Sequence, residues 1–153
     1  MSVLIQGDQL RTIRFGIKVD RATASLPQTT QSALFTVATG RVLLTGIVGE
    51  VTTVIQTQAN NTKIVSNPTT GTDVDLCAVL NITAKEVGTL FGITGLFSDA
   101  LVGANAGAGV LPRNGIVIPI GTIDLNCAAS NTGSVKWSVT YVPLDNGATI
   151  TAA

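Results

Sequence analysis

The chain has 153 residues, of which 45% are hydrophobic and only 12% are charged, and its nine basic and nine acidic residues leave no net charge. This length fits a single domain that buries a hydrophobic core without disulfide bonds. The zero net charge argues against nucleic acid as a partner, because phosphate binding needs an excess of cationic side chains. No apolar stretch approaches the roughly 18 residues that predict a membrane span, so we expect no membrane partner.

The low charge content also predicts self-association. Soluble domains typically have about 25% charged residues, and a chain with far fewer is expected to cover part of its surface against other subunits. We therefore expect a homo-oligomer, and a trimer in particular, because closed cyclic symmetry hides an apolar patch without forming fibres. Residues 115–120 are apolar on both faces of an expected strand, so we assign the subunit contact to them.

The first eight residues lack both the basic start and the long apolar run of a secretory signal. The chain is therefore expected to stay in the cytoplasm where it is made. Cytoplasmic proteins rarely form disulfides, so Cys77 and Cys127 are expected to be reduced thiols that fill the core.

Residues 1–21 differ in composition from the rest, and we interpret them as an N-terminal arm. From Ile13 to Val19, apolar residues alternate with charged or small ones, which is the period of a β-strand. Four of the nine basic residues also lie in the arm. The pattern has two interpretations: an ordinary first strand with a solvated face, or a strand that docks electrostatically on a partner.

Residues 22–153 are expected to form one β-rich domain. The uncharged stretch from Ala22 to Ser32 predicts an extended linker, and strands are expected near 33–38, 41–55 and 62–66. Within the second of these strands, Gly46 and Gly49 predict a bulge or a close approach of another segment. Short strands at this spacing predict an all-β fold. We expect either a β-sandwich of the jelly-roll-like kind or a β-barrel, with the N-terminal arm extended from it.

A pair of carboxylates begins the next expected strand, which runs from Val74 to Ile82. Asp73 and Asp75 lie on the same side of a strand, where they could hold Ca²⁺ with Asn67 as the nearest further oxygen donor. No other acidic residue follows at the spacing of an EF-hand loop, so we expect a solvated strand edge and assign no metal and no cofactor.

The stretch from Thr122 to Tyr141 is predicted to be one β-hairpin around which the core is built. Both halves alternate between apolar and polar residues, and the residues between them, 130–133, favour a turn. Large aromatic side chains bury much apolar area, and this stretch holds the chain's single Trp and single Tyr. The inward side chains are expected to be Ile123, Leu125, Cys127, Val135, Trp137, Val139 and Tyr141.

The sequence offers little for catalysis. It has no histidine, and its acidic residues are scattered singly apart from Asp73 and Asp75. We therefore expect a protein that is not an enzyme. The alternative is an active site assembled from scattered residues at a subunit interface, as in trimeric β-rich nucleotide hydrolases.

Two segments resemble small structural proteins of tailed bacteriophages, chiefly the head decoration or cement proteins. These segments are the run from Gly133 to Ala148, which contains Val135-Lys136-Trp137-Ser138-Val139-Thr140-Tyr141, and the run Gly88-Thr89-Leu90-Phe91-Gly92-Ile93-Thr94-Gly95. The resemblance implies a β-rich protein, commonly trimeric, that binds the outside of the capsid shell at symmetry axes.

On this resemblance we expect a structural virion protein that stabilises an icosahedral phage head by bridging capsid subunits. Its partners would be the major capsid protein and further copies of itself, and its location would be the capsid surface after synthesis in the bacterial cytoplasm. A tail or fibre component that contacts the host surface is the alternative.

The arm is the expected docking element for capsid or for a neighbouring subunit. Its apolar side chains would fill a groove while its backbone adds a strand to an exposed sheet edge, and its basic side chains would face acidic groups on the partner. The candidate partner-binding residues are Arg11, Ile13, Arg14, Phe15, Ile17, Lys18 and Val19.

Overall fold

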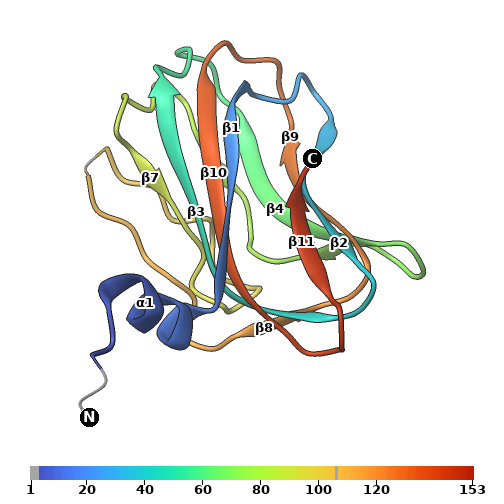
Figure 1. Cartoon of the computed structure of the whole chain (residues 1–153). Coiled ribbons are helices and arrows are strands. Elements are labelled where there is room, and N and C mark those ends of the chain that lie inside the picture. The colour runs from blue at the N-terminus through green and yellow to red at the C-terminus, as the bar shows by residue number, and fades with distance from the viewer. Residues whose placement is uncertain (1–3, 106) are drawn as a thin grey trace.

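The computed structural model describes residues 4–105 and 107–153, and its fold is all β apart from one short helix. Two antiparallel sheets stack face to face, and the core lies between them (Figure 1). The predicted all-β sandwich is therefore confirmed. The barrel alternative is wrong, because within the described residues the strands pair as two separate sheets and do not close into one.

Sheet A has five strands, and β10 and β3 are its long central pair. Its edges are β1 on one side and two short strands, β7 and β8, that pair with β3 on the other. The strands of this sheet are β1 (Ile17–Ser25), β10 (Ser134–Pro143), β3 (Val42–Thr53), β7 (Leu90–Phe91) and β8 (Ile116–Ile118).

Sheet B has six strands, and β9 lies at its centre between β2 and β4. Strand β11 extends the sheet beyond β2, and the short strands β5 and β6 both pair with β4. The strands of this sheet are β11 (Thr149–Ala152), β2 (Gln31–Ala38), β9 (Gly121–Cys127), β4 (Asn61–Pro68), β5 (Val74–Asp75) and β6 (Leu80–Asn81).

Trp137 on β10 occupies the middle of the core, as the alternation predicts. Its side chain is buried and stacks on Phe91 with 6.2 Å between ring centroids. Gly49 lies directly opposite on β3, and a Cβ there would come within 2.7 Å of the indole ring. The expected close approach at Gly49 is therefore the indole packing on bare backbone, and the expected bulge lies near Gly46, where the β10–β3 register shifts.

The predicted hairpin from Thr122 to Tyr141 is wrong, although both of its strands exist. Strand β9 pairs with β2 and β4 in sheet B, whereas β10 pairs with β1 and β3 in sheet A. The connection at residues 128–133 therefore crosses from one layer to the other. Alternation identifies which residues face the core, but it is the same for two strands in one sheet and for two strands in facing sheets.

Buried asparagines hold this crossing in place. The Asn131 side chain donates to the carbonyls of Gln56 and Gln58, at 3.3 and 2.8 Å, and accepts a hydrogen bond from Asn60 at 3.3 Å. Both asparagines are almost fully buried, so their polar atoms need these internal partners. The segment predicted as a hairpin turn is thus an arch fixed by side-chain hydrogen bonds.

The two cysteines are free and buried, as predicted. Burial raises the pKa of both thiols, because a thiolate is poorly solvated in the core. The backbone N–H of Ile64 donates to Cys77 Sγ at 3.4 Å, and Thr62 Oγ1 lies 3.6 Å from Cys127 Sγ. Both thiols therefore pack beside β4 as small core residues.

An ion pair joins the turn before β3 to the turn after β10. Arg41 Nε and Nη2 donate to the two carboxylate oxygens of Asp145 at 3.0 and 2.9 Å, and the Arg41 backbone N–H donates at 2.8 Å. These hydrogen bonds lower the pKa of Asp145 to about 2. The contact ties together two turns at the end of the sandwich where the helix lies (Figure 1).

Neighbouring residues on β10 provide a test of the strand register. Trp137→Ala is expected to lower the free energy of unfolding by about 3 to 5 kcal/mol, because it empties a large buried volume. Lys136→Ala removes only an exposed ion pair with Glu50 and should cost under about 1 kcal/mol. Urea denaturation of both variants makes the comparison, and a larger loss for Lys136→Ala would show that the register is shifted by one residue.

The Arg41–Asp145 pair predicts a pH-dependent contribution to stability. The folded-state pKa of Asp145 is lowered from 3.8, so its contribution is present above about pH 4 and is lost as the pH falls through about 2. Asp145→Asn should therefore be less stable than the wild type at pH 6, with a difference that shrinks between pH 4 and 2. Urea midpoints measured across this range test the assignment, and a difference that stayed constant would contradict it.

Candidate interaction surface

The first regular element in the described part of the N-terminal arm is helix α1 (Gly7–Phe15) and not a strand. The side chain of Gln9 accepts a hydrogen bond from the backbone N–H of Gln6 at 3.0 Å and so caps the first turn. Asp8 in the first turn and Arg14 in the last turn are both placed favourably for the helix dipole. These local signals favour a helix over the alternation that predicts a strand.

The strand predicted through Ile13 and Phe15 is therefore wrong, and pairing with β10 begins only at Ile17. Strand β1 then runs to Ser25, so the boundary expected after residue 21 falls inside a strand of sheet A. The expected linker from Ala22 to Ser32 is likewise partly strand. The alternation belongs to a strand only from Ile17 onward. The pattern before it, in residues 13–16, covers four residues and is too short to distinguish a strand from a helix.

Gly16 joins α1 to β1 at a point of very close packing. Its φ of +90° lies in the region that favours glycine, and a Cβ there would come within 2.0 Å of the Tyr141 carbonyl oxygen. The Gly16 N–H donates to Thr12 O at 2.9 Å and closes the helix. Thr45 Oγ1 donates to the carbonyl of Phe15, so the C-terminal end of α1 is held against sheet A.

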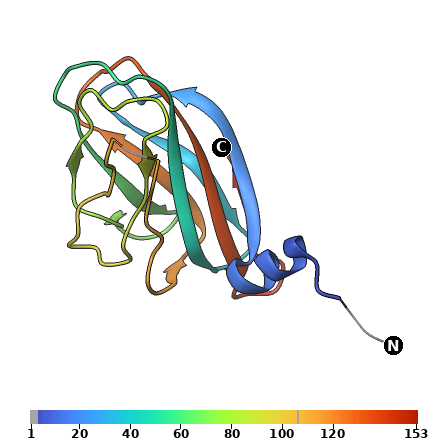
Figure 2. The same cartoon turned by 90° about the vertical axis from the view of Figure 1, so that its left-hand side faces the viewer.

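The remainder of α1 extends from the end of the sandwich (Figure 2). No residue of the helix is buried. Leu10 and Ile13 lie three residues apart on neighbouring positions of the helix surface, with 59% and 71% of their residue surfaces exposed. Leu4 and Ile5, which precede the helix, are also exposed. The helix therefore presents an apolar face that nothing in the described residues covers.

A groove of about 210 Å³ separates the C-terminal end of α1 from the loop between β7 and β8. Arg11 and Phe15 form one wall, and Leu111 of the loop forms part of the other. Gly46 contributes to the floor, where a side chain would collide with Thr140 and Leu111. The absence of a side chain at Gly46 therefore keeps the groove open.

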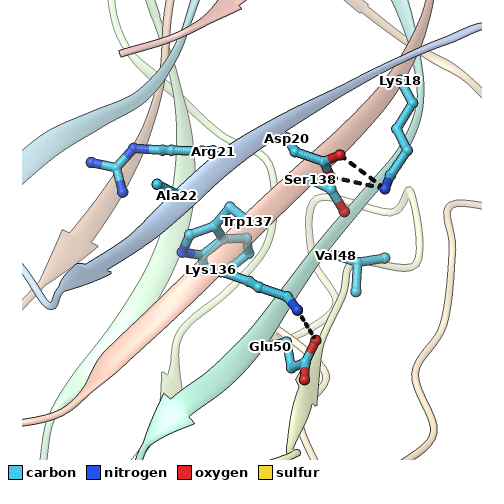
Figure 3. A pocket seen from close by; sticks show the side chains of 9 residues that line it. All are labelled: Lys18, Asp20, Arg21, Ala22, Val48, Glu50, Lys136, Trp137 and Ser138. Atoms are coloured by element: carbon cyan, nitrogen blue, oxygen red, sulfur yellow. Dashed lines mark hydrogen bonds and ion pairs between the residues drawn. The ribbon is translucent and has the colours of Figure 1, made fainter.

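A charged cleft of about 470 Å³ adjoins the groove on the outer face of sheet A (Figure 3). Lys18 pairs with Asp20 at 2.9 Å, and Lys136 pairs with Glu50 at 2.9 Å, with all four side chains substantially exposed. The groove and the cleft share three lining residues, Lys18, Val48 and Ser138. We refer to α1, the groove and the cleft together as the docking face.

The structure brings some of the seven predicted docking residues together. Arg11, Phe15 and Lys18 line the groove, and the Arg14 guanidinium lies over the Phe15 ring, 5.5 Å from its centroid. Val19 instead packs against the core of the sandwich. The four predicted apolar residues do not share one face, because Ile13 and Phe15 lie on the helix while Ile17 and Val19 lie on β1.

The sequence reasoning missed several residues of the docking face. Leu10 is an exposed apolar residue like Ile13, and a helix predicted over residues 7–15 places the two on the same face. Leu111, Glu50 and Lys136 join the face from distant parts of the chain, with no signal in the local sequence.

In residues 4–105 and 107–153, no helix is long and apolar enough to cross a membrane, and no three His, Cys, Asp or Glu side chains cluster in a way that could hold a metal ion. No protein-family model matches the chain, and neither the curated proteins nor the solved structures contain a match. The docking face is therefore interpreted from its own geometry.

Proposed function

We propose that this protein is a structural virion component that binds the outside of an icosahedral phage capsid and bridges neighbouring capsid subunits. The observation that carries the proposal is the exposed apolar face of α1 on a helix anchored only at its C-terminal end. The resemblance of the segments around Trp137 and Phe91 to head decoration proteins supports the same assignment. The major capsid protein is the proposed partner.

Burial of apolar area supplies the binding free energy in this mechanism. Burying Leu10 and Ile13 fully gains roughly 1.5 to 3 kcal/mol for each side chain, part of which offsets the loss of freedom on association. A stable contact buries about 800 Å² on each partner. Many copies on one shell then hold their sites jointly, because each bound contact raises the effective concentration of the next.

Charge on α1 speeds the association of the two partners. Arg11 and Arg14 form no ion pair with any residue in the described part of the chain, and both lie beside the apolar face. Opposite acidic groups on a capsid surface would raise the association rate more than the final affinity. Binding through these exposed charges weakens as salt shortens the range of their attraction.

Removing the helix tests the proposal. Deletion of residues 1–15 leaves β1 and its pairing with β10 intact, so the truncated protein is expected to fold and to lose co-sedimentation with empty heads. Leu10→Ser combined with Ile13→Ser should weaken head binding at least tenfold without lowering the unfolding midpoint, since both side chains are already exposed. Val87→Ser is the matched control, because Val87 is equally exposed in the turn before β7.

Undiminished head binding by the folded deletion variant would remove α1 as the docking element. Binding of the wild type to host cell envelopes, with none to heads, would favour the tail or fibre alternative.

We also propose that the protein is a homo-oligomer, specifically a trimer. Val117 and Ile120 support a subunit contact near β8, because 53% and 45% of their surfaces are exposed while Ile116 and Ile118 face the core. Light scattering at micromolar concentration is expected to give about three times the chain mass of 15.6 kDa. Val117→Lys should lower this mass, and a monomer mass for the wild type would contradict the proposal.

A further inference from the structure

The outer face of sheet B holds a polar cluster centred on Asp124 of β9. Three side chains surround it: Gln31 on β2, Asn67 on β4 and Asp73 in the turn before β5. Gln31 Nε2 donates to Asp73 Oδ2 at 2.8 Å and to Asp124 Oδ2 at 2.9 Å. Asn67 Nδ2 donates to the same Asp124 oxygen at 2.9 Å. Two carboxylates and two amides from four separate segments thus converge on one small volume.

Asp124 is not fully satisfied by this arrangement. The residue is only 3% exposed, and none of the ion pairs in the described chain includes it. Its second oxygen, Oδ1, has no hydrogen-bond partner and is the one buried side-chain polar atom in residues 4–105 and 107–153 that lacks one. A buried carboxylate without a cation and with an unpartnered oxygen is energetically costly. This orphan oxygen points to a ligand that carries positive charge.

Lys63, on the adjacent strand β4, does not supply that charge. Lys63 Nζ is held by Asp75 Oδ2 at 2.6 Å, on the other side of Val65 from Asp124 in the strand register. Asp75 therefore has its own counter-ion, while Asp73 and Asp124 are bridged only by a neutral amide. The two carboxylates with neighbouring sequence positions, Asp73 and Asp75, consequently belong to different environments.

We propose that Asp73, Asp124, Gln31 and Asn67 form a Ca²⁺ site. The oxygen and nitrogen of an amide have nearly the same shape, so a half-turn of the Gln31 amide places Oε1 where Nε2 stands. That oxygen then lies about 2.8 Å from Asp73 Oδ2 and about 2.9 Å from Asp124 Oδ2. A cation held by both oxygens of Asp124, as carboxylates hold Ca²⁺ at 2.3 to 2.6 Å, also gives the unpartnered Oδ1 its contact. Asn67, whose Nδ2 now donates to Asp124 Oδ2, turns its amide in the same way to present its oxygen. Asn126, which now donates to Gln31 Oε1 at 3.2 Å, turns its own amide to match.

The donor set is that of Ca²⁺. This ion takes six to eight oxygen ligands in flexible geometry, including carboxylates, amide carbonyls and water. Asp73 is exposed, which leaves room for water ligands on the solvent side. Mg²⁺ is a poorer fit, because it demands near-ideal octahedral geometry at shorter distances. With two carboxylates and an exposed side, the affinity belongs to the weak class, with a dissociation constant of about 10⁻⁴ to 10⁻³ M.

Bound Ca²⁺ would tie the turn before β5 to the central strands of sheet B. Asp73 lies in that turn, while Gln31 and Asp124 lie on β2 and β9. A ligand that binds only the folded state stabilises it in proportion to its occupancy. The site is independent of the docking face, which lies on sheet A, so the inference stands or falls separately from the proposed function.

Thermal unfolding of the full chain in calcium tests the site. At neutral pH, 10 mM CaCl₂ is expected to raise the midpoint by about 3 to 10 °C over a sample in EDTA at matched ionic strength. The same concentration of MgCl₂ should give a smaller shift. Equilibrium dialysis with radioactive calcium should give one bound ion per chain.

Two exposed aspartates of the same region give matched variants. Asp73→Asn should abolish most of the calcium-dependent shift, whereas Asp75→Asn, which affects only the Lys63 pair, should retain it. Asp124→Asn should also abolish the shift. If the Asp124→Asn variant fails to fold, Asp73→Asn still tests the calcium site. A wild-type midpoint unchanged by calcium, or an equal shift in the wild type and Asp73→Asn, would overturn the proposal.

Discussion

The packing of Trp137 between β10 and β3 is the contact on which the sandwich depends. The indole lies on the bare backbone of Gly49 and stacks on Phe91 of β7, so one side chain fixes the spacing of three strands in sheet A. Because β10 is also the partner of β1, the same strand sets where the N-terminal segment runs. The position of α1 thus follows from the core, through β10, β1 and the close contact at Gly16.

The two outer faces of the sandwich have different characters. Sheet A carries ion pairs, an apolar groove and an exposed helix, which suit contact with another macromolecule. Sheet B carries carboxylates and amides that hydrogen-bond with one another around a buried aspartate, one of whose oxygens has no partner. The ion pairs of sheet A and the polar cluster of sheet B stand at outward positions of their strands, where packing in the core does not dictate the residue type.

The candidate surface could be only partly predicted from the sequence. The concentration of basic residues near the N-terminus predicted a docking element there, and this stays a prediction. Of the predicted residues, Arg11, Phe15 and Lys18 line one groove. The assumed strand was wrong because capping at Gln9 and the glycine at position 16 favour a helix that ends before Ile17. Asp124 was unremarkable in the sequence, since a single polar residue in a strand gives no sign that it is buried among amides from β2 and β4.

By itself, the sequence determined the all-β class, the inward faces of β9 and β10, and the burial of Trp137, Tyr141 and both cysteines. These properties follow from the alternation of side chains along a strand, which is local. Only the tertiary structure decided that β9 and β10 lie in opposite sheets, that Gly49 receives the indole, and that Gln31 links Asp73 to Asp124 while Asp75 pairs with Lys63. Strand pairing and the convergence of side chains depend on segments that are distant in the chain. The apolar and polar alternation of one strand is the same whichever strand it pairs with, so the pattern does not identify the partner.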